Sequence, residues 1–350
     1  MTNYILDYYQ AIKSGEITVG QNILRWYEQV IDGLQEKRYT YNAKKANRAI
    51  KFIQGFCHHH EGPLAPELIK LELWQKAFLS VVFGIQDSDG RRQFREVVLI
   101  IARKNGKTLF AAAISAYMLY LDGEYGARVF YCAPKLQQAQ LCFNGLYQMI
   151  QKEPELSTLS KKRRSDIYVA SSNSSAEPLA FNAKKSDGLN PSLAVCDEIA
   201  SWQGDAGLKQ YEVIKSALGA RRQPMILSIS TAGYINESIY DELIKRCTAV
   251  LLGTSKETRL APFLYMIDDV EKWNDINELQ KSNPNLGVSV SVDYLLEEIA
   301  VAEGSLSKKA EFITKYCNIK QNASTAWLEA ETVNRASSAD FSLDDFRDMY

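Results

Sequence analysis

The first 70 residues of the chain show the hydrophobic spacing of helices. In the stretch NAKKANRAIKFIQGF, the apolar residues Ala46, Ile50, Ile53 and Phe56 recur three or four positions apart. This spacing places them on one face of a helix. We therefore expect residues 1–70 to form a helical region that caps a larger domain and carries no catalytic group.

Four short runs rich in β-branched and apolar residues follow this region. They are separated by segments long enough for helices, and they comprise VVLIIA (97–102), ARVFYCAP (127–134), LAVCD (193–197) and MILSIST (225–231). Alternation of strands with helices is typical of parallel sheets that are covered on both faces. The pattern predicts an α/β fold with a mostly parallel central sheet flanked by helices.

After residue 267 the chain becomes polar and helix-prone again. The stretches VDYLLEEIAVAE (292–303) and AEFITKYCNI (310–319) predict a small helical subdomain behind the sheet. We therefore divide the chain into four parts, which are a helical region (1–70), a sheet-containing core (71–267), a lid or linker subdomain (268–330) and a tail (331–350).

Composition narrows the function classes. The 41 basic and 42 acidic residues give a net charge of −1, so no global positive field indicates a nucleic-acid partner, and any DNA contact must be local. The six cysteines are scattered without a C-x-x-C pair, which favours reduced thiols in a cytosol. No signal peptide and no apolar stretch of about 18 residues is present, so we expect a soluble, unprocessed protein.

A candidate phosphate-binding loop directly follows the run at 97–102. It precedes the helical stretch LFAAAISAYMLYL and consists of Arg103, Lys104, Asn105, Gly106, Lys107 and Thr108. In such a strand–loop–helix unit, backbone N–H groups surround phosphate oxygens, Lys107 neutralises their charge and the Thr108 hydroxyl ligates Mg²⁺. The usual pattern G-x-x-x-x-G-K-[ST] requires glycine where this chain has Ile101, so the prediction rests on the surrounding strand and helix.

A second candidate motif lies at the end of the run LAVCD, where Asp197 is followed by Glu198. A P-loop nucleotidase needs an acidic residue beside the Mg²⁺ and a base that activates the attacking water. We assign the first role to Asp197 and the second to Glu198. The alternative for this pair is a simple acidic cap at the end of a strand, and the alternative for the loop is a basic surface turn.

The order of these motifs resembles that of the large terminase subunit of tailed bacteriophages, a DNA-packaging ATPase. LELWQKAF (71–78) resembles the adenine-side motif of that family, and ARKNGKT (102–108) resembles its deviant phosphate loop. LAVCDEIASW and GARRQPMILSISTAG (219–233) resemble its acidic strand end and the segment after it, and SNPNLG (282–287) and FITKYCNI (312–319) resemble its linking or lid region. The resemblance extends from about residue 3 to residue 328.

The resemblance implies roles for further residues. Gln75, after Trp74, would read the adenine base, Arg103 would act as a catalytic arginine of the loop, and Ser230 and Thr231 would couple hydrolysis to movement. It implies ATP and Mg²⁺ as cofactors, and double-stranded DNA, a portal ring and a small terminase subunit as partners. It also implies a ring of subunits on the procapsid, or a monomer when free, in the cytoplasm of the infected bacterial host.

Two features depart from the family pattern. The stretch NAKKSDGLNPS before the acidic strand contains no arginine, so the finger that would stabilise the γ-phosphate stays unassigned, with candidates in Arg103, Arg128, Lys184, Lys185, Arg221 and Arg222. The nuclease of the family uses clustered carboxylates to bind two metal ions. Because the final residues offer only Asp340, Asp344, Asp345 and Asp348 in a polar tail, we expect no complete nuclease in this chain.

Three other groups of residues have simpler interpretations. Cys57 and the adjacent histidines 58–60 cannot all face one ion, so we expect loop histidines and no metal site. The basic runs RRQFR (91–95) and KKRR (161–164) each favour a solvated surface over a DNA contact. The rival functions are a helicase-like or remodelling ATPase that acts on nucleic acid and a scaffold that binds nucleotide without hydrolysing it.

Overall fold

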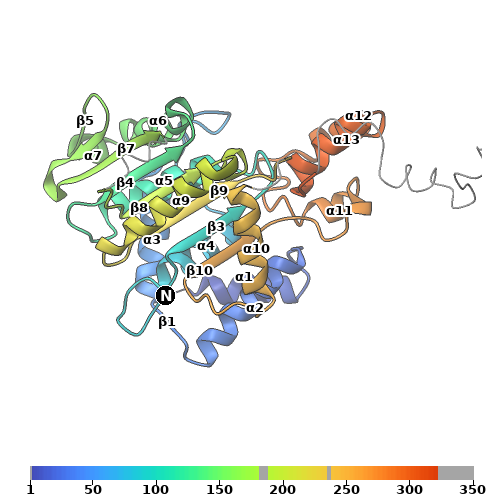
Figure 1. The fold of residues 1–350 in the computed structure, drawn as a ribbon, viewed down its shortest axis with the longest axis horizontal. Helices are drawn as coiled ribbons and strands as arrows, with labels where there is room; N and C mark the ends of the chain where they lie inside the picture. The colour runs from blue at the N-terminus through green and yellow to red at the C-terminus, as the bar shows by residue number, and fades with distance from the viewer. Residues whose placement is uncertain (1, 181–187, 235–237, 322–350) are drawn as a thin grey trace, which may run out of the picture.

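An eight-stranded sheet forms the centre of the computed structural model, which describes residues 2–180, 188–234 and 238–321 (Figure 1). The spatial order of its strands is β10 (Leu260–Leu264), β3 (Glu96–Ile100), β9 (Met225–Ser230), β8 (Leu193–Asp197), β4 (Arg128–Ala133), β7 (Ser174–Ala180), β6 (Ile167–Val169) and β5 (Ser160–Lys162). Neighbours from β10 to β7 are parallel, and β5 and β6 are antiparallel additions. The predicted mostly parallel sheet is confirmed.

Strand β9 separates β3 from β8 at the centre of the sheet. In the parallel register Ile100 of β3 pairs with Ser230 of β9, and Asp197 of β8 pairs with Ile229. The carboxyl ends of the three strands therefore lie at one edge of the sheet. This arrangement, with one added strand between the two motif-bearing strands, brings the predicted phosphate loop and the predicted acidic pair together.

Helices cover both faces of the sheet (Figure 1). One face carries α5 (Lys107–Tyr120) and α6 (Leu136–Lys152), with α3 (Ala43–Phe56) and α4 (Leu73–Leu79) beside them, and the other carries α9 (Gly204–Ala217) and α10 (Ile239–Leu251). Nearly all of α5 is buried, from Phe110 to Leu119, which explains its alanine-rich and uniformly apolar sequence. The short α7 (Pro154–Leu159) leads from α6 into β5.

The N-terminal helices α1 (Tyr4–Lys13), α2 (Gln21–Gln35) and α3 pack into the same apolar core as the sheet. Trp26 of α2 lies edge-on against Phe263 of β10, with ring centroids 5.8 Å apart. Asn3 and Asn42 cap α1 and α3 by accepting backbone N–H groups. The predicted helix around Ile50 is confirmed, and a short pair of strands, β1 (Thr40–Tyr41) and β2 (Ile85–Gln86), joins α3 to the core.

The segment after β10 forms a smaller helical body beyond the carboxyl edge of the sheet (Figure 1). It contains α11 (Ile276–Leu279), α12 (Val292–Glu303), α13 (Leu306–Phe312) and a π-helical turn (Ile313–Cys317). Its apolar residues, among them Trp273, Leu295 and Phe312, form a cluster separate from the main core. We refer to residues 268–321 as the lid.

Two observations correct or refine the sequence analysis. The run at 91–95 is not a solvated face, because Arg92 and Phe94 are buried and Arg92 forms a 2.6 Å ion pair with Asp122. By contrast, Lys161, Lys162, Arg163 and Arg164 are exposed.

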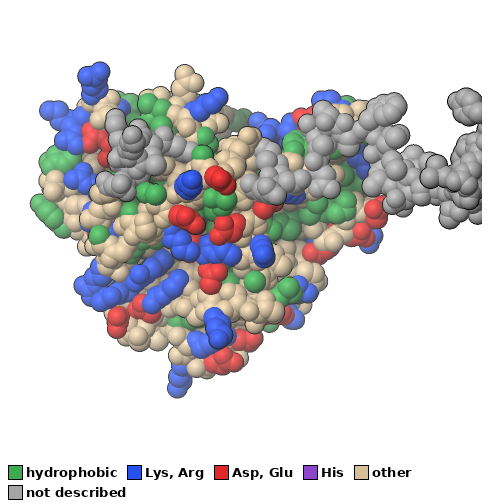
Figure 2. Space-filling model, viewed as in Figure 1, with side chains coloured by type: hydrophobic (Ala, Val, Ile, Leu, Met, Phe, Trp, Pro, Cys, Tyr) green, Lys and Arg blue, Asp and Glu red, His purple; other side chains and the backbone are tan. Residues whose placement is uncertain are grey.

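No helix among the residues described is long and apolar enough to cross a membrane. Figure 2 shows the face of the molecule that is turned to the viewer in Figure 1. Basic and acidic side chains are interspersed over its centre, in keeping with the net charge of −1.

Candidate functional site: a phosphate loop facing an acidic pair

The phosphate loop joins β3 to α5, and its geometry explains why the first glycine is dispensable. Ile101 is fully buried, and its N–H donates to the carbonyl of Ser230 at 3.1 Å, so this residue simply continues the edge of the sheet. The left-handed backbone falls instead on Lys104 (φ 67°) and Gly106 (φ 77°). A Cβ at Gly106 would meet only the Asn285 side chain, at 4.0 Å, so the loop leaves open space before the first turn of α5.

The acidic pair faces this loop. Glu198 Oε1 lies 2.8 Å from Lys107 Nζ. Glu198 itself has left-handed backbone angles (φ 49°, ψ 51°), which costs a non-glycine residue conformational energy and directs its side chain out of the line of β8. Strained residues of this kind cluster at functional sites. The structure thus brings together Lys107 and Glu198, which lie 91 residues apart in the sequence.

Asp197 lies deeper in the same site. Its Oδ1 accepts the N–H of Glu198 at 2.9 Å, and its Oδ2 accepts the thiol of Cys142 at 2.7 Å. Burial, and next the charge of Glu198, raise the pKa of the Asp197 carboxyl, although Cys142 and Lys107 act in the opposite direction. Such a carboxylate is stabilised by a nearby cation. The hydroxyl of Thr108 forms no hydrogen bond with the residues described here, so it is available as a ligand.

The predicted coupling residues connect the two motifs. The hydroxyl of Ser230 accepts the N–H of Ala200, just after the acidic pair, at 3.1 Å, and donates to the carbonyl of Thr231. The carbonyl of Ser230 accepts the N–H of Ile101 at the start of the loop. Two residues after Ser230, the N–H of Ala232 donates to Asn318 Oδ1 of the lid at 2.7 Å. This segment therefore contacts the start of the loop, the turn after the acidic pair and the lid.

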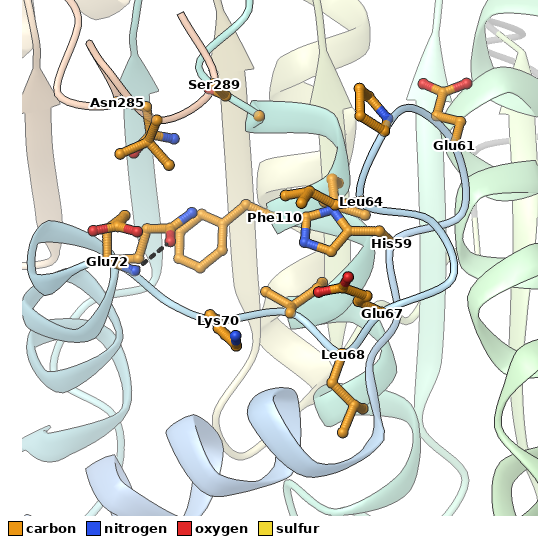
Figure 3. Close-up of a pocket in the computed structure, with 16 residues that line it drawn as sticks. His59, Glu61, Leu64, Glu67, Leu68, Lys70, Glu72, Phe110, Asn285 and Ser289 are labelled. Carbon is orange, nitrogen blue, oxygen red and sulfur yellow. Dashed lines mark hydrogen bonds between the residues drawn. The ribbon is translucent and has the colours of Figure 1, made fainter.

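A cavity of about 540 Å³ adjoins the loop at Gly106 and the first turn of α5. Its lining comes from the loop after α3, from α4 and α5, and from the lid, and includes His59, Leu64, Leu68, Gln75, Phe110 and Val288. Figure 3 shows Phe110 in the middle of these residues, with Asn285 and Ser289 on the lid side. A largely apolar slot with a few polar groups suits a planar heterocycle.

The two residues predicted on the adenine side take different positions. Gln75 lines the cavity, with its Oε1 held by the N–H of Glu72 at 2.9 Å. Trp74 does not line it: the indole is 3% exposed, packs edge-on against Phe110 and Tyr265, and donates to Asn285 Oδ1 at 2.7 Å. Direct contact with the base therefore remains a prediction for Gln75. Trp74 instead packs against Phe110, which itself lines the cavity.

The finger candidates are also separated by the structure. Arg128 donates to the Ser175 hydroxyl, and Arg221 donates to backbone carbonyls of Asn190 and Gly126. Both arginines lie at the amino ends of the parallel strands, at the edge opposite the loop. Arg222 is exposed at that same edge. Arg103 is exposed in the loop, so among the finger candidates that the structure describes it is the one beside the site. Lys184 and Lys185 lie outside the described residues.

The histidine cluster shows no metal-site geometry. His58 bonds the carbonyl of Pro66 and the carboxylate of Glu153, as a loop histidine does, and Cys57 is buried. Within residues 2–180, 188–234 and 238–321, no group of three or more His, Cys, Asp and Glu side chains is arranged to hold a metal ion. The aspartates predicted as tail surface, Asp340, Asp344, Asp345 and Asp348, lie outside these ranges.

Sequence reasoning missed three residues around the loop. Cys142 was noted only as a scattered thiol, and nothing in its neighbourhood on α6 pointed to Asp197. The sequence places Asn283 and Asn285 only in a stretch that resembles the lid region, yet both contact Asn105 of the loop, at 2.9 and 3.0 Å. Two asparagines that flank a proline were the available signal, because buried asparagine must find hydrogen-bond partners.

Strand order, loop and acidic pair together define a P-loop nucleotidase with an added central strand. A family model described as "Terminase large subunit, ATPase domain" matches residues 73–248. The chain belongs to the terminase large subunit family, and it carries the ATPase domain of that family. This confirms the resemblance that the motifs indicated.

A second model, "Terminase large subunit, endonuclease domain", matches residues 258–349. From the sequence alone we expect the end of the core, a lid and a tail over this stretch, and no complete nuclease. The match shows that sequence of the endonuclease domain begins within this chain, near β10, so residues 268–350 are more than a lid and a tail.

Two curated proteins and a solved structure are similar to this chain. Protein YmfN of Escherichia coli (strain K12) is 32% identical over 164 residues, 47% of this chain and 35% of that protein. The large terminase subunit of Enterobacteria phage HK97 is 30% identical over 190 residues, 53% of this chain and 36% of that protein. The crystal structure of the HK97 large terminase matches with a TM-score of 0.65 and 25% identity over 79% of this chain and 55% of that one. The matches thus span about a third of the curated relatives' length.

Proposed function

We propose that this chain hydrolyses ATP at the site formed by the phosphate loop and the acidic pair. The observation that carries the proposal is the 2.8 Å contact between Lys107 and Glu198 across the intervening strand. In this arrangement the ammonium of Lys107 and the carboxylate of Glu198 neutralise each other's charge. Both groups are therefore already within reach of one reacting centre.

The chain's own residues then have separate tasks. The N–H groups at the start of α5 and the ammonium of Lys107 bind phosphate oxygens, aided by the positive end of the helix. The carboxylate of Glu198, 45% exposed, accepts a proton from the attacking water. Arg103 adds positive charge at the rim of the loop. The apolar cavity around Phe110 and Gln75 receives the base.

The residues present also fit Mg²⁺. Asp197 is a carboxylate whose pKa is raised by burial, and Thr108 offers a hydroxyl at the first turn of α5. A bound Mg²⁺ would supply positive charge to the β- and γ-phosphates. Asp197 and Thr108 would hold it, and the contacts of Asp197 with Cys142 and with the Glu198 N–H fix the carboxylate's orientation.

Replacing Glu198 with Gln tests this proposal. The amide keeps the shape of the side chain but cannot accept a proton, so we expect at least a ~100-fold loss of phosphate release with ATP binding retained. Glu212→Gln, an exposed position on α9, is the matched control and should keep full turnover. If the wild-type chain binds ATP but hydrolyses it no faster than the Glu198→Gln variant does, a non-hydrolysing scaffold is the better description.

We further propose that hydrolysis drives double-stranded DNA into a procapsid, as the family membership supports. The partners would be duplex DNA, a portal ring, the small terminase subunit and further copies of this chain in a ring, in the cytoplasm of the infected host. The test is ATP-dependent protection of duplex DNA from added nuclease by procapsids bearing the portal. Strand separation on forked DNA without such protection would indicate a helicase-like enzyme.

A further inference from the structure

The conformation of the phosphate loop is set from outside the sheet. Each residue from 102 to 105 forms a hydrogen bond with the lid, and the pairs are Ala102 N–H to Ser282 O (3.3 Å), Arg103 N–H to Lys315 O (3.0 Å), Ser289 Oγ to Lys104 O (2.7 Å), and Asn105 to both Asn283 and Asn285. The lid therefore contacts the loop at each of the four positions before Gly106, although the side chains of Arg103 and Lys104 stay exposed.

Three buried asparagines form the centre of this contact, and we call them the asparagine latch (Asn105, Asn283 and Asn285). Asn105 Nδ2 donates to Asn283 Oδ1 at 2.9 Å, while the backbone N–H and the Nδ2 of Asn285 reach Asn105 Oδ1 and its carbonyl, both at 3.0 Å. Their exposed fractions are 1%, 1% and 5%. Because buried polar groups are costly to leave unpaired, the latch specifies one arrangement of loop and lid.

The latch also has a fixed anchor on each side. On the lid, Asn283 Nδ2 donates to the carbonyls of Leu279 and Tyr316, both at 2.9 Å. On the core, Trp74 Nε1 donates to Asn285 Oδ1. The indole of Trp74 is thus one hydrogen bond away from a residue that itself bonds the phosphate loop.

We infer that Asn283 and Asn285 are positioning residues for the phosphate loop, and that they hold it in the phosphate-binding form in place of the missing first glycine. Lys104 has a left-handed backbone (φ 67°), which a non-glycine residue adopts only when its surroundings enforce it. The lid supplies that enforcement through the latch and through Ser289. The inference rests on the proposed ATPase, because it concerns the same loop.

Loss of the latch should therefore raise KM much more than it lowers kcat. Without the latch the loop populates other conformations, and the apparent affinity falls in proportion to the fraction that remains competent. A bound nucleotide restores the competent loop, so turnover at saturation changes much less. A purely structural role would instead lower the amount of folded protein and leave the KM of the folded fraction unchanged.

The experiment compares Asn283→Ala and Asn285→Ala with Asn277→Ala, an exposed asparagine on α11 of the same lid. We expect the KM for Mg·ATP and the Kd for Mg·ADP to rise about tenfold in the two latch variants, kcat to fall less than about threefold, and the control to match wild type. Ser289→Ala, which removes one bond at the exposed rim, is the milder variant and should raise KM about threefold.

Tryptophan emission gives a second readout. Mg·ADP should change the emission of the wild type, and this change should be absent in Trp74→Phe and in Asn285→Ala. In the opposing outcome, the wild-type chain hydrolyses ATP while Asn283→Ala, Asn285→Ala and Ser289→Ala all keep the wild-type KM and Kd. That result would overturn the positioning role of Asn283 and Asn285 and leave the proposed function intact. A wild-type chain that binds no nucleotide would overturn the proposed function itself.

Discussion

Glu96 provides a test of the fold that is independent of the catalytic site. It is the first residue of β3, at the edge of the sheet opposite the phosphate loop, and its side chain is 8% exposed. Arg246 of α10 contacts its two carboxylate oxygens at 2.9 and 3.1 Å, Lys215 of α9 lies at 2.8 Å, and the Tyr211 hydroxyl donates at 3.0 Å. This carboxylate therefore ties both helices of one face to the sheet.

The magnitude follows from what Glu96→Gln leaves behind. Removing one partner of a buried ion pair costs about 3–5 kcal/mol of unfolding free energy. Arg246 keeps a second carboxylate, Glu257, at 2.5 Å, and Lys215 is 43% exposed, so both cations stay partly solvated or paired. We therefore expect a loss of about 2–3 kcal/mol, which lowers the melting temperature by about 5 °C in a domain of this size.

The effect should depend on pH with a definite sign. Burial alone would raise the pKa of Glu96, but the hydrogen bonds and charges of Arg246 and Lys215 outweigh it and hold the pKa below the usual value of a glutamate. A group with a depressed folded-state pKa stabilises the protein above its unfolded pKa, and this contribution is lost as the pH falls through the folded pKa. The difference between wild type and variant should thus be full near neutral pH and shrink below about pH 4.

Thermal unfolding of wild type, Glu96→Gln and the control Glu212→Gln across this pH range is the assay. ATP turnover per folded molecule should be unchanged in Glu96→Gln, because the active site lies at the other edge. A destabilisation that stayed constant down to about pH 3.5 would refute the electrostatic account and leave only a packing effect.

Further substitutions probe the site and the packing of α9. Asp197→Asn should reduce Mg²⁺-dependent turnover at least ~100-fold in a phosphate-release assay, and unchanged turnover would exclude it as the metal ligand. Cys142→Ala should raise the Mg²⁺ concentration for half-maximal turnover about threefold, and Cys142→Ser should restore it, because either hydroxyl or thiol donates to Asp197. Gly207→Ala should cost about 1–3 kcal/mol in denaturant titrations, since its Cβ would lie 2.6 Å from the Trp202 carbonyl, whereas Gly219→Ala, with open space, should be neutral.

The central part of the fold was predictable because its signals are local. An apolar strand must precede the loop and a helix must follow it, so Lys107 and Thr108 could be placed without the first glycine. The strand ending at Asp197 was equally apolar. Their convergence then followed from the parallel sheet, whose carboxyl ends share one edge.

Other elements lack a local signal. Strand β7 begins with two serines, and β10 contains Pro262, a residue tolerated there because β10 is an edge strand. Arg92 reads as surface in the sequence, yet its partner Asp122 is 30 residues away. The latch likewise joins positions about 180 residues apart, so tertiary contact alone explains it.

A structure of the chain with Mg²⁺ and a non-hydrolysable ATP analogue would test the central claim most directly. We predict phosphates at the start of α5, with Lys107 turned from Glu198 to the phosphate oxygens, the metal held by Thr108 and Asp197, and the base in the cavity beside Phe110. A nucleotide bound elsewhere, with the 2.8 Å contact between Lys107 and Glu198 intact, would contradict it.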